Sequence, residues 1–274
     1  MTGRMVSFDP LRTLDIPGVI PMKPEHWLSR QDIVQAADWI LFPEYWQVNA
    51  LVYGWKKKIF PSISSFHLGH DKVEMTRVFQ AVCPENTPFT QILAHTDLAI
   101  EQVLDEFCFP FVAKEVRNSM GQGVFLIETR KNLLDYAKSN SVLYVQEYLP
   151  INRDLRLVLV GNKVVAGYWR KAAPGQFHNN VSRGGSVSFE NIPEGAVRLV
   201  ESFAGQTGIN HAGFDVADVD GHFYFLEFNI RFGTRALIDR GIRLYPYIQS
   251  YLNEKSPNDP LISAVFNPPG SSPC

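Results

Sequence analysis

The segment HFYFLEFN at residues 222–229 constrains the fold of this chain more than any other. Its aromatic and leucine side chains predict a buried β-strand, yet Glu227 and Asn229 lie two positions apart and therefore on one face of it. A carboxylate and an amide are costly in an apolar layer unless something compensates them. The preceding run HAGFDVADV, followed by Asp220-Gly221, predicts that the two runs pair as a hairpin.

The register of this hairpin decides where Asp215 points. With a two-residue Asp220-Gly221 turn and regular strands, Asp215 would pair with Leu226 and face away from Glu227. One extra residue, in a longer loop or in a β-bulge, places Asp215 directly opposite Glu227, and we expect that residue. The two carboxylates and the neighbouring amide would then be hard oxygen ligands for Mg²⁺ held jointly with substrate phosphates. The alternative is an exposed strand face with ordinary polar residues.

The rest of the chain mixes helical and extended patterns without strict βαβ alternation, which favours an α+β architecture in lobes. Residues 1–66 predict a small, irregular leading module with one short helix near 29–38, and the tail 267–274 has a disordered composition. Helices are expected over 71–82, 96–107, 131–139 and 194–208, strands over 109–116, 123–128 and 142–149, and a hairpin over 155–172 that turns at Gly161-Asn162.

Composition excludes several classes of function. A formal charge of −2 over 274 residues leaves no electrostatic footprint for nucleic acid or a membrane surface. No stretch approaches the length of a membrane span, and the N-terminus lacks the apolar core of a signal peptide. The three cysteines, Cys83, Cys108 and Cys274, have no metal or redox spacing, so we expect reduced thiols in a cytoplasmic protein.

A second polar feature precedes the hairpin. Lys114 lies near the end of an expected strand, and the glycine-containing loop 119–123 leads into the next one. Such a loop allows backbone N–H groups to approach phosphate oxygens, while a lysine supplies a point charge. The loop matches neither a Walker A motif nor a dinucleotide fingerprint, and a plain flexible hairpin is the alternative explanation.

The order of these parts resembles the ATP-grasp superfamily, and within it the RimK-type ligases that join amino acids to a carboxylate. GHDKVEMTRVF resembles the helix that precedes the nucleotide lobe, and FVAKEVRNSMGQGV resembles the lysine strand and glycine loop. VQEYL is similar to the adenine hinge, and DLRLVLVGNKVVAGYWRKA to the hairpin behind it. FHNNVSRGG followed by GFDVADVDGHFYFLEFN is close to the most specific stretch of the family. The resemblance covers about residues 66–254.

The resemblance implies an α+β ATP-grasp fold in which two α+β lobes clamp a nucleotide behind a short N-terminal module. It divides the chain into a reduced N-terminal module at 1–66, an N-lobe at 67–145, a C-lobe at 146–256 and a flexible tail at 257–274. The implied cofactors are ATP and Mg²⁺, with Mn²⁺ as an alternative.

The resemblance also implies roles for individual residues. Arg170, Arg183 and Arg231 would act near the transferred phosphate and the acyl intermediate, with Arg231, and Arg235 beside it, as an alternative site for the acceptor carboxylate. The metal ligands would be Asp215, Glu227 and Asn229. ATP would be bound by Lys72, Lys114, Ser119, Gly121, Gln122, Gly123, Gln146, Glu147, Tyr148, Leu149, Asp154, His178, Asn179 and Asn180.

The implied activity is ATP-dependent amide formation through an acyl phosphate, with release of ADP and phosphate. The chain departs from the RimK pattern after Asn229, where IRFG replaces a small loop and resembles carboxylase-type enzymes instead. The expected partners are therefore a carboxylate and an amine, carried by a small molecule or by a peptide or protein tail, with homo-oligomerisation left open. The alternatives are a nucleotide-binding protein without turnover and an ATP-grasp kinase that stops after phosphorylation.

Overall fold

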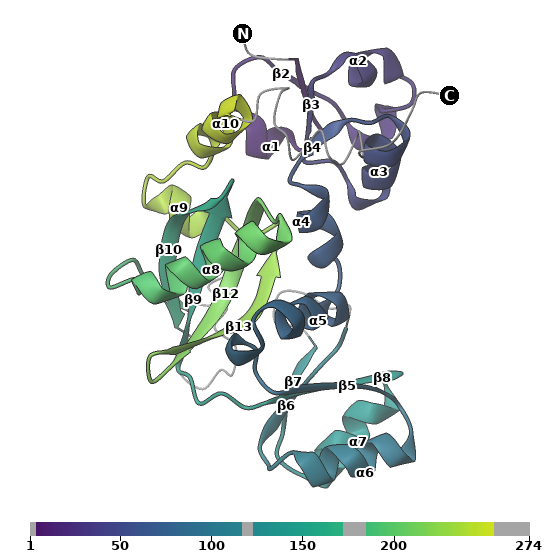
Figure 1. The fold of residues 1–274 in the computed structure, drawn as a ribbon, viewed down its shortest axis with the longest axis vertical. Helices are drawn as coiled ribbons and strands as arrows, with labels where there is room; N and C mark the ends of the chain where they lie inside the picture. The colour runs from purple at the N-terminus through teal and green to yellow at the C-terminus, as the bar shows by residue number, and fades with distance from the viewer. Residues whose placement is uncertain (1–3, 117–122, 172–184, 255–274) are drawn as a thin grey trace.

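The computed structural model describes residues 4–116, 123–171 and 185–254. Within them lie three β-sheets, which Figure 1 shows one above another along the long axis of the molecule. The first sheet belongs to the N-terminal module at the top, the second lies at the bottom, and the third lies between them beside helix α8 (Glu194–Thr207). The mixture of helices and antiparallel sheets in separate lobes agrees with the expected α+β architecture.

The N-terminal module is more regular than its sequence suggests. Four strands of three residues each pair in parallel in the order β2-β1-β3-β4. Helix α2 (Gln31–Ala36) falls inside the expected helical stretch. The strands were not anticipated because three residues are too few to show alternation. Their bounds are β1 Met5–Ser7, β2 Val19–Pro21, β3 Trp39–Leu41 and β4 Lys58–Phe60, and the module's other helices are α1 Pro10–Thr13 and α3 Tyr45–Asn49.

The second sheet is antiparallel, in the order β5-β8-β6-β7. Helices α6 and α7 pack together on one side of it, as Figure 1 shows. The side chains of Thr96 and Thr129 cap these helices by accepting hydrogen bonds from backbone N–H groups of the first turn. Every expected element is present, and β5 is an addition. The bounds are β5 Thr90–Ala94, α6 Asp97–Glu106, β6 Phe111–Lys114, β7 Val124–Ile127, α7 Arg130–Lys138 and β8 Val142–Glu147.

The third sheet is antiparallel, in the order β11-β10-β9-β12-β13. Helix α8 ends at Gly208, whose φ of 76° places it in the left-handed region that the sequence predicted for it. Leu155, Leu157 and Leu159 of β9 pack with α8 in the largest apolar cluster, so the residues that alternate with them belong to the opposite face. The bounds are β9 Arg153–Val160, β10 Lys163–Lys171, β11 Ser186–Ser188, β12 His211–Val219 and β13 His222–Asn229.

Helix α5 (Lys72–Val82) connects the second and third sheets. Asp71 caps it by accepting from Glu74 N at 2.9 Å, as the sequence indicated. Phe79 stacks on Phe225 with ring centroids 4.7 Å apart, which anchors the helix to the third sheet. Thr76 Oγ1 lies 2.7 Å from the Tyr144 hydroxyl of β8 in the second sheet. Helices α4 (Ile63–Leu68), α9 (Arg235–Asp239) and α10 (Tyr245–Glu254) complete the fold.

Among the helices formed by the described residues, none combines the length and apolar character that crossing a membrane requires.

Candidate functional site

The hairpin of β12 and β13 contains the predicted extra residue. Asp215 pairs with Glu227, while Val216 pairs with Phe225, which leaves Leu226 without a partner on β12. The turn itself has only two residues, since Val219 pairs with His222. The extra residue is therefore a β-bulge within the strand, and it brings the two carboxylates opposite each other as expected.

Asp215 belongs to a buried network of alternating charges on the polar face of the third sheet. Arg156 of β9 donates to both of its carboxylate oxygens, through Nε and, at 3.0 Å, through Nη2. Arg170 of β10 contacts Asp215 at 2.9 Å and donates from Nε to Asp154 at 2.6 Å. The sequence analysis missed Arg156 because this residue lies within the apolar run LRLVLV. Its position opposite Asp215 becomes evident only from the pairing of β9 with β12.

The two arginines keep the carboxylate of Asp215 ionised. Burial alone would raise the pKa of Asp215, but the charges and hydrogen bonds of Arg156 and Arg170 outweigh it and hold that pKa below its usual value. The same pairing outweighs the effect of burial on Arg170 and raises its pKa. Together with Asp154 the network holds two negative and two positive charges, which suits a buried position.

Lys114, at the end of β6 in the second sheet, interacts with Glu227 of the third sheet. It is 8% exposed and its ammonium lies 5.7 Å from the centre of the Tyr144 ring. Burial lowers the pKa of Lys114 to about 8, Glu227 opposes this shift, and Lys72 at the start of α5 adds to it. Lys114, Lys72 and Glu227 are thus close enough to interact although they come from three different elements. Electrostatic interaction thus links the predicted phosphate-binding lysines to a predicted metal ligand.

A divalent cation would find two oxygen donors on β13. Glu227 and Asn229 are half-buried neighbours, and the Asn229 amide donates to Glu227 Oε1 at 3.0 Å. Among the described residues no three carboxylate, imidazole or thiol groups converge on one point. Mg²⁺ is often held by one or two protein oxygens together with water and substrate phosphates, so Glu227 and Asn229 fit it. A metal ion bound by Asp215 would have to compete with the guanidinium groups of Arg156 and Arg170 for its carboxylate.

At the expected adenine hinge, several groups have partners within the chain. Gln146 is buried and donates to Thr90 Oγ1 at 2.8 Å. The Glu147 carboxylate accepts from Phe89 N at 2.6 Å, while Glu147 N donates to Phe89 O at 2.9 Å. Leu149 O accepts from Ile151 N at 2.8 Å, and Tyr148 is 38% exposed. The hinge begins in the last two residues of β8, whose partner β6 carries Lys114.

Several predicted residues lie outside the described part of the chain: Ser119, Gly121, Gln122, His178, Asn179, Asn180 and Arg183. Of the glycine loop, Gly123 is described, with a φ of 73°, and its carbonyl accepts from Glu115 N at 2.7 Å.

Arg231 and Arg235 lie apart from the network. Arg231 forms an ion pair with Glu44 of the N-terminal module at 3.0 Å, beside a hollow of about 180 Å³. Arg235 is bonded to Asp239 on the exposed side of α9.

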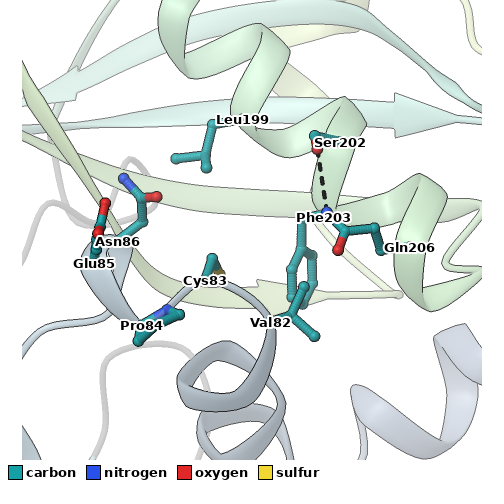
Figure 2. Close-up of a pocket in the computed structure, with 9 residues that line it drawn as sticks. All are labelled: Val82, Cys83, Pro84, Glu85, Asn86, Leu199, Ser202, Phe203 and Gln206. Carbon is teal, nitrogen blue, oxygen red and sulfur yellow. Dashed lines mark hydrogen bonds between the residues drawn. The ribbon is translucent and has the colours of Figure 1, made fainter.

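A larger hollow of about 340 Å³ lies between α8 and the segment that follows α5, as Figure 2 shows. Cys83 lines it, and burial raises the pKa of this thiol to about 11, so it is a poor nucleophile. The lining includes Leu199 and Phe203 of α8, the helix that covers the apolar face of the third sheet, so this hollow is separate from the network.

Comparison with known proteins agrees with this arrangement. A sequence model of the RimK-like ATP-grasp domain matches residues 70–251. A probable alpha-L-glutamate ligase of Alcanivorax borkumensis is 40% identical over 114 residues, which are 39% of this chain and 37% of that protein. The ribosomal protein bS6–L-glutamate ligase of Escherichia fergusonii is 32% identical over 134 residues, 47% of this chain and 45% of that protein. The match thus spans less than half the length of these relatives.

Solved structures share the fold. A RimK domain ATP-grasp protein from Sphaerobacter thermophilus superposes with a TM-score of 0.67 at 15% identity, covering 90% of this chain and 98% of that one. The D-alanine–D-alanine ligase of Bacillus anthracis in complex with ATP superposes with a TM-score of 0.69 at 14% identity, covering 92% and 97%.

Proposed function

The chain belongs to the RimK-like ATP-grasp family, and on that premise we propose that it is an ATP-dependent ligase that joins a carboxylate to an amine. The observation that carries the proposal is the electrostatic interaction of Lys114 from the second sheet with Glu227 from the third, which opposes the lowering of the pKa of Lys114 by burial. A cation from one lobe and a carboxylate from the other suit a triphosphate bound between the lobes. The relatives named as glutamate ligases support the same class of reaction.

We assign the phosphates of ATP to Lys114 and Lys72. Their positive charges would offset the negative charge of the β- and γ-phosphates. Glu227 and Asn229 would hold Mg²⁺, or Mn²⁺ in its place, and the ion would supply further neutralisation of phosphate charge. Adenine would lie against the hinge 146–149, with Asp154 on the ribose side as the sequence predicted. We also propose that the glycine loop, His178, Asn179 and Asn180 contact ATP and that Arg183 acts in catalysis, as the family resemblance implies.

The reaction proceeds in two displacements. An oxygen of the substrate carboxylate attacks the γ-phosphorus, and the bond to the β-phosphate oxygen breaks, so that ADP leaves and an acyl phosphate forms. The amine then attacks the acyl carbon, loses a proton and expels phosphate. We place Arg170 and Arg156 beside the transferred group, because a planar guanidinium can bind phosphate oxygens in pairs. In this assignment Asp215 holds both arginines in position.

We propose a cytoplasmic location, as the lack of metal or redox spacing among the three cysteines led us to expect. We propose a small-molecule or peptide carboxylate and an amine as the substrates, and we include protein tails because one relative is named for a ribosomal protein.

The test is nucleotide turnover with Mg-ATP and a pool of amino acids, dipeptides and organic acids, analysed by mass spectrometry. ADP release that depends on an amine and yields a new amide mass is the expected result. ADP with a stable phosphorylated acceptor would identify a kinase instead. ATP binding without a product from either this pool or added peptide tails would contradict the ligase. Glu227→Gln serves as the inactive control in each arm.

A further inference from the structure

Tyr144 is a buried tyrosine of β8 that the proposed reaction does not use. It pairs with Lys114 across β8 and β6, so the two side chains lie on the same face of the second sheet. The Lys114 ammonium lies 5.7 Å from the centre of the Tyr144 ring, a distance at which the face of an aromatic ring attracts a cation. The ring therefore stabilises the charged form of a lysine that burial disfavours.

The hydroxyl of Tyr144 connects this pair to helix α5. It lies 2.7 Å from Thr76 Oγ1, and both side chains are buried. Lys72 precedes Thr76 by four residues, so the two residues share one face of the helix. The hydrogen bond between Thr76 and Tyr144 thus fixes the helix face that carries Lys72 against the strands that carry Tyr144 and Lys114.

The backbone at Lys114 and Tyr144 has an anchor of its own. The Tyr136 hydroxyl of α7 donates to Lys114 O at 2.7 Å and accepts from Tyr144 N at 3.2 Å. Loss of the Tyr144 hydroxyl would therefore leave β6 and β8 in place and remove only the hydrogen bond to α5.

Tyr144 also belongs to the electrostatic environment of the proposed site. Burial raises the pKa of its hydroxyl to about 12, and the charge of Glu227 adds to this shift. The charge of Glu227 likewise raises the pKa of Lys114 against the effect of burial. The hydroxyl therefore stays protonated at neutral pH and forms its hydrogen bond without adding a charge to the site.

The two lysines need such a connection because their positive charges repel each other. Burial lowers the pKa of Lys114, and the charge of Lys72 contributes to the same shift. Moving the ammonium groups apart would relieve this repulsion as long as no phosphate is bound. A hydrogen bond that prevents the movement keeps both groups in position for one polyphosphate chain, so less free energy is lost in ordering them on binding.

From these contacts we propose that Tyr144 is a positioning residue, whose hydrogen bond to Thr76 holds the Lys114 ammonium at a fixed separation from Lys72 so that both contact the phosphates of ATP. The ring of the tyrosine holds the cation, and its hydroxyl holds the helix. The inference rests on the proposed function, because it explains how the phosphate site of that ligase is prepared for its ligand. A purely structural hydrogen bond would instead affect folding and leave phosphate binding unchanged.

Thr76→Val and Tyr144→Phe each remove one hydroxyl and keep the shape of the side chain. We expect each to raise the Kd for a non-hydrolysable Mg-ATP analogue about fivefold, as for loss of one hydrogen bond of ordinary strength. The double variant should bind no more weakly than either single variant, because both remove the same bond. Thr76→Ser keeps the hydroxyl and should bind like the wild type. Isothermal titration calorimetry on the full chain gives the Kd, and wild-type affinity in both single variants would overturn the proposal.

The Lys114→Met background separates positioning from folding. There Tyr144→Phe should weaken binding of the analogue less than about twofold, because the ammonium that the tyrosine positions is absent. A hydrogen bond that served the fold alone would cost the same factor in both backgrounds, and equal factors would refute the positioning role. Thr207→Val on α8 and Tyr251→Phe on α10 also remove hydrogen-bonded hydroxyls and are the matched controls, which should bind like the wild type.

Failure of this inference and failure of the proposed function give different results. If the wild type binds ATP and forms the amide while both hydroxyl variants bind ATP equally well, the positioning role is wrong and the ligase stands. If the wild type does not bind ATP, the ligase is contradicted, and inorganic tripolyphosphate becomes the probe of the two lysines. Tripolyphosphate binding that weakens about fivefold in Tyr144→Phe would support the positioning role, whereas unchanged or absent binding would overturn it.

Discussion

Asp215 and Glu227 face each other across β12 and β13, and each faces a different cation. Asp215 accepts from Arg156 and Arg170 of the same sheet, whereas the charge of Glu227 acts on Lys114 of the other lobe. The bulge at Leu226 makes this possible, because without it Glu227 would lie on the opposite face. Asp215 therefore stabilises the polar face of the third sheet, whereas Glu227 is placed to interact with a ligand between the lobes.

Glu227→Gln should abolish turnover and leave the fold intact. The substitution keeps the shape of the side chain but removes the charge that we assign to the metal and to Lys114. We expect kcat to fall about a hundredfold or more, as for loss of one strong electrostatic group in an active site. Turnover is measured by ADP release and folding by circular dichroism. Glu194→Gln, on the exposed end of α8, is the control and should keep full activity; wild-type kcat in Glu227→Gln would refute the metal assignment.

Lys114→Met should weaken ATP binding without destabilising the protein. Lys114 is buried, and burial lowers its pKa to about 8 because the charged ammonium loses its hydration. A methionine of similar shape has no charge and therefore avoids this cost in folding free energy. We expect the Kd for ATP to rise about tenfold or more, because a charged contact with phosphate is lost. The melting temperature should stay the same or rise. Unchanged ATP affinity would mean that the phosphates lie elsewhere.

Asp215→Asn should cost far more stability than removing a carboxylate from the surface. It would leave Arg156 and Arg170 buried without a full countercharge, which typically costs about 3–5 kcal/mol. Asp239→Asn removes the partner of exposed Arg235 and should change the free energy of unfolding by about 0.5 kcal/mol or less. Urea unfolding monitored by tryptophan fluorescence compares the two. Equal effects would show that the buried network does not stabilise the fold.

The sequence predicted the elements of both lobes well, because caps, turns and alternating patterns are set by residues only a few positions apart. Asp71, Gly208 and the Asp220-Gly221 turn all act where they were expected. The bulge was predictable because only one register brings Asp215 and Glu227 together. Its place within the strand, at Leu226, was left open because loop and bulge shift the register equally.

The features that were missed depend on contacts between distant segments. The strands of the N-terminal module pair in parallel across long connections, and each has only three residues. Arg156 becomes a site residue only through its neighbours on β12 and β10. Arg231 forms an ion pair with Glu44 and donates to Pro43 O, which lies 188 positions earlier in the chain, and no local pattern in the sequence reveals contacts over such a separation.

His211 should make the protein sensitive to mild acid. It begins β12, is fully buried, and neither ring nitrogen has a hydrogen-bond partner among the described residues. Phe42, Phe60 and Phe232 surround it at ring distances between 5.2 and 5.3 Å. Burial, with a smaller contribution from Arg12, lowers its pKa from the usual 6.5 to about 3.

The unfolded chain therefore binds a proton at this histidine between pH 6.5 and about 3, and the folded chain does not. Stability must fall as the pH decreases through this range, by about 1.4 kcal/mol per pH unit below 6.5. His211→Leu removes this proton uptake and should flatten that part of the stability profile, measured by urea unfolding between pH 7.5 and 5. His95→Leu makes the same change at an exposed position and should leave the slope of the wild type unaltered. If His211→Leu lost stability as steeply as the wild type over this range, the acid sensitivity would have to come from other groups.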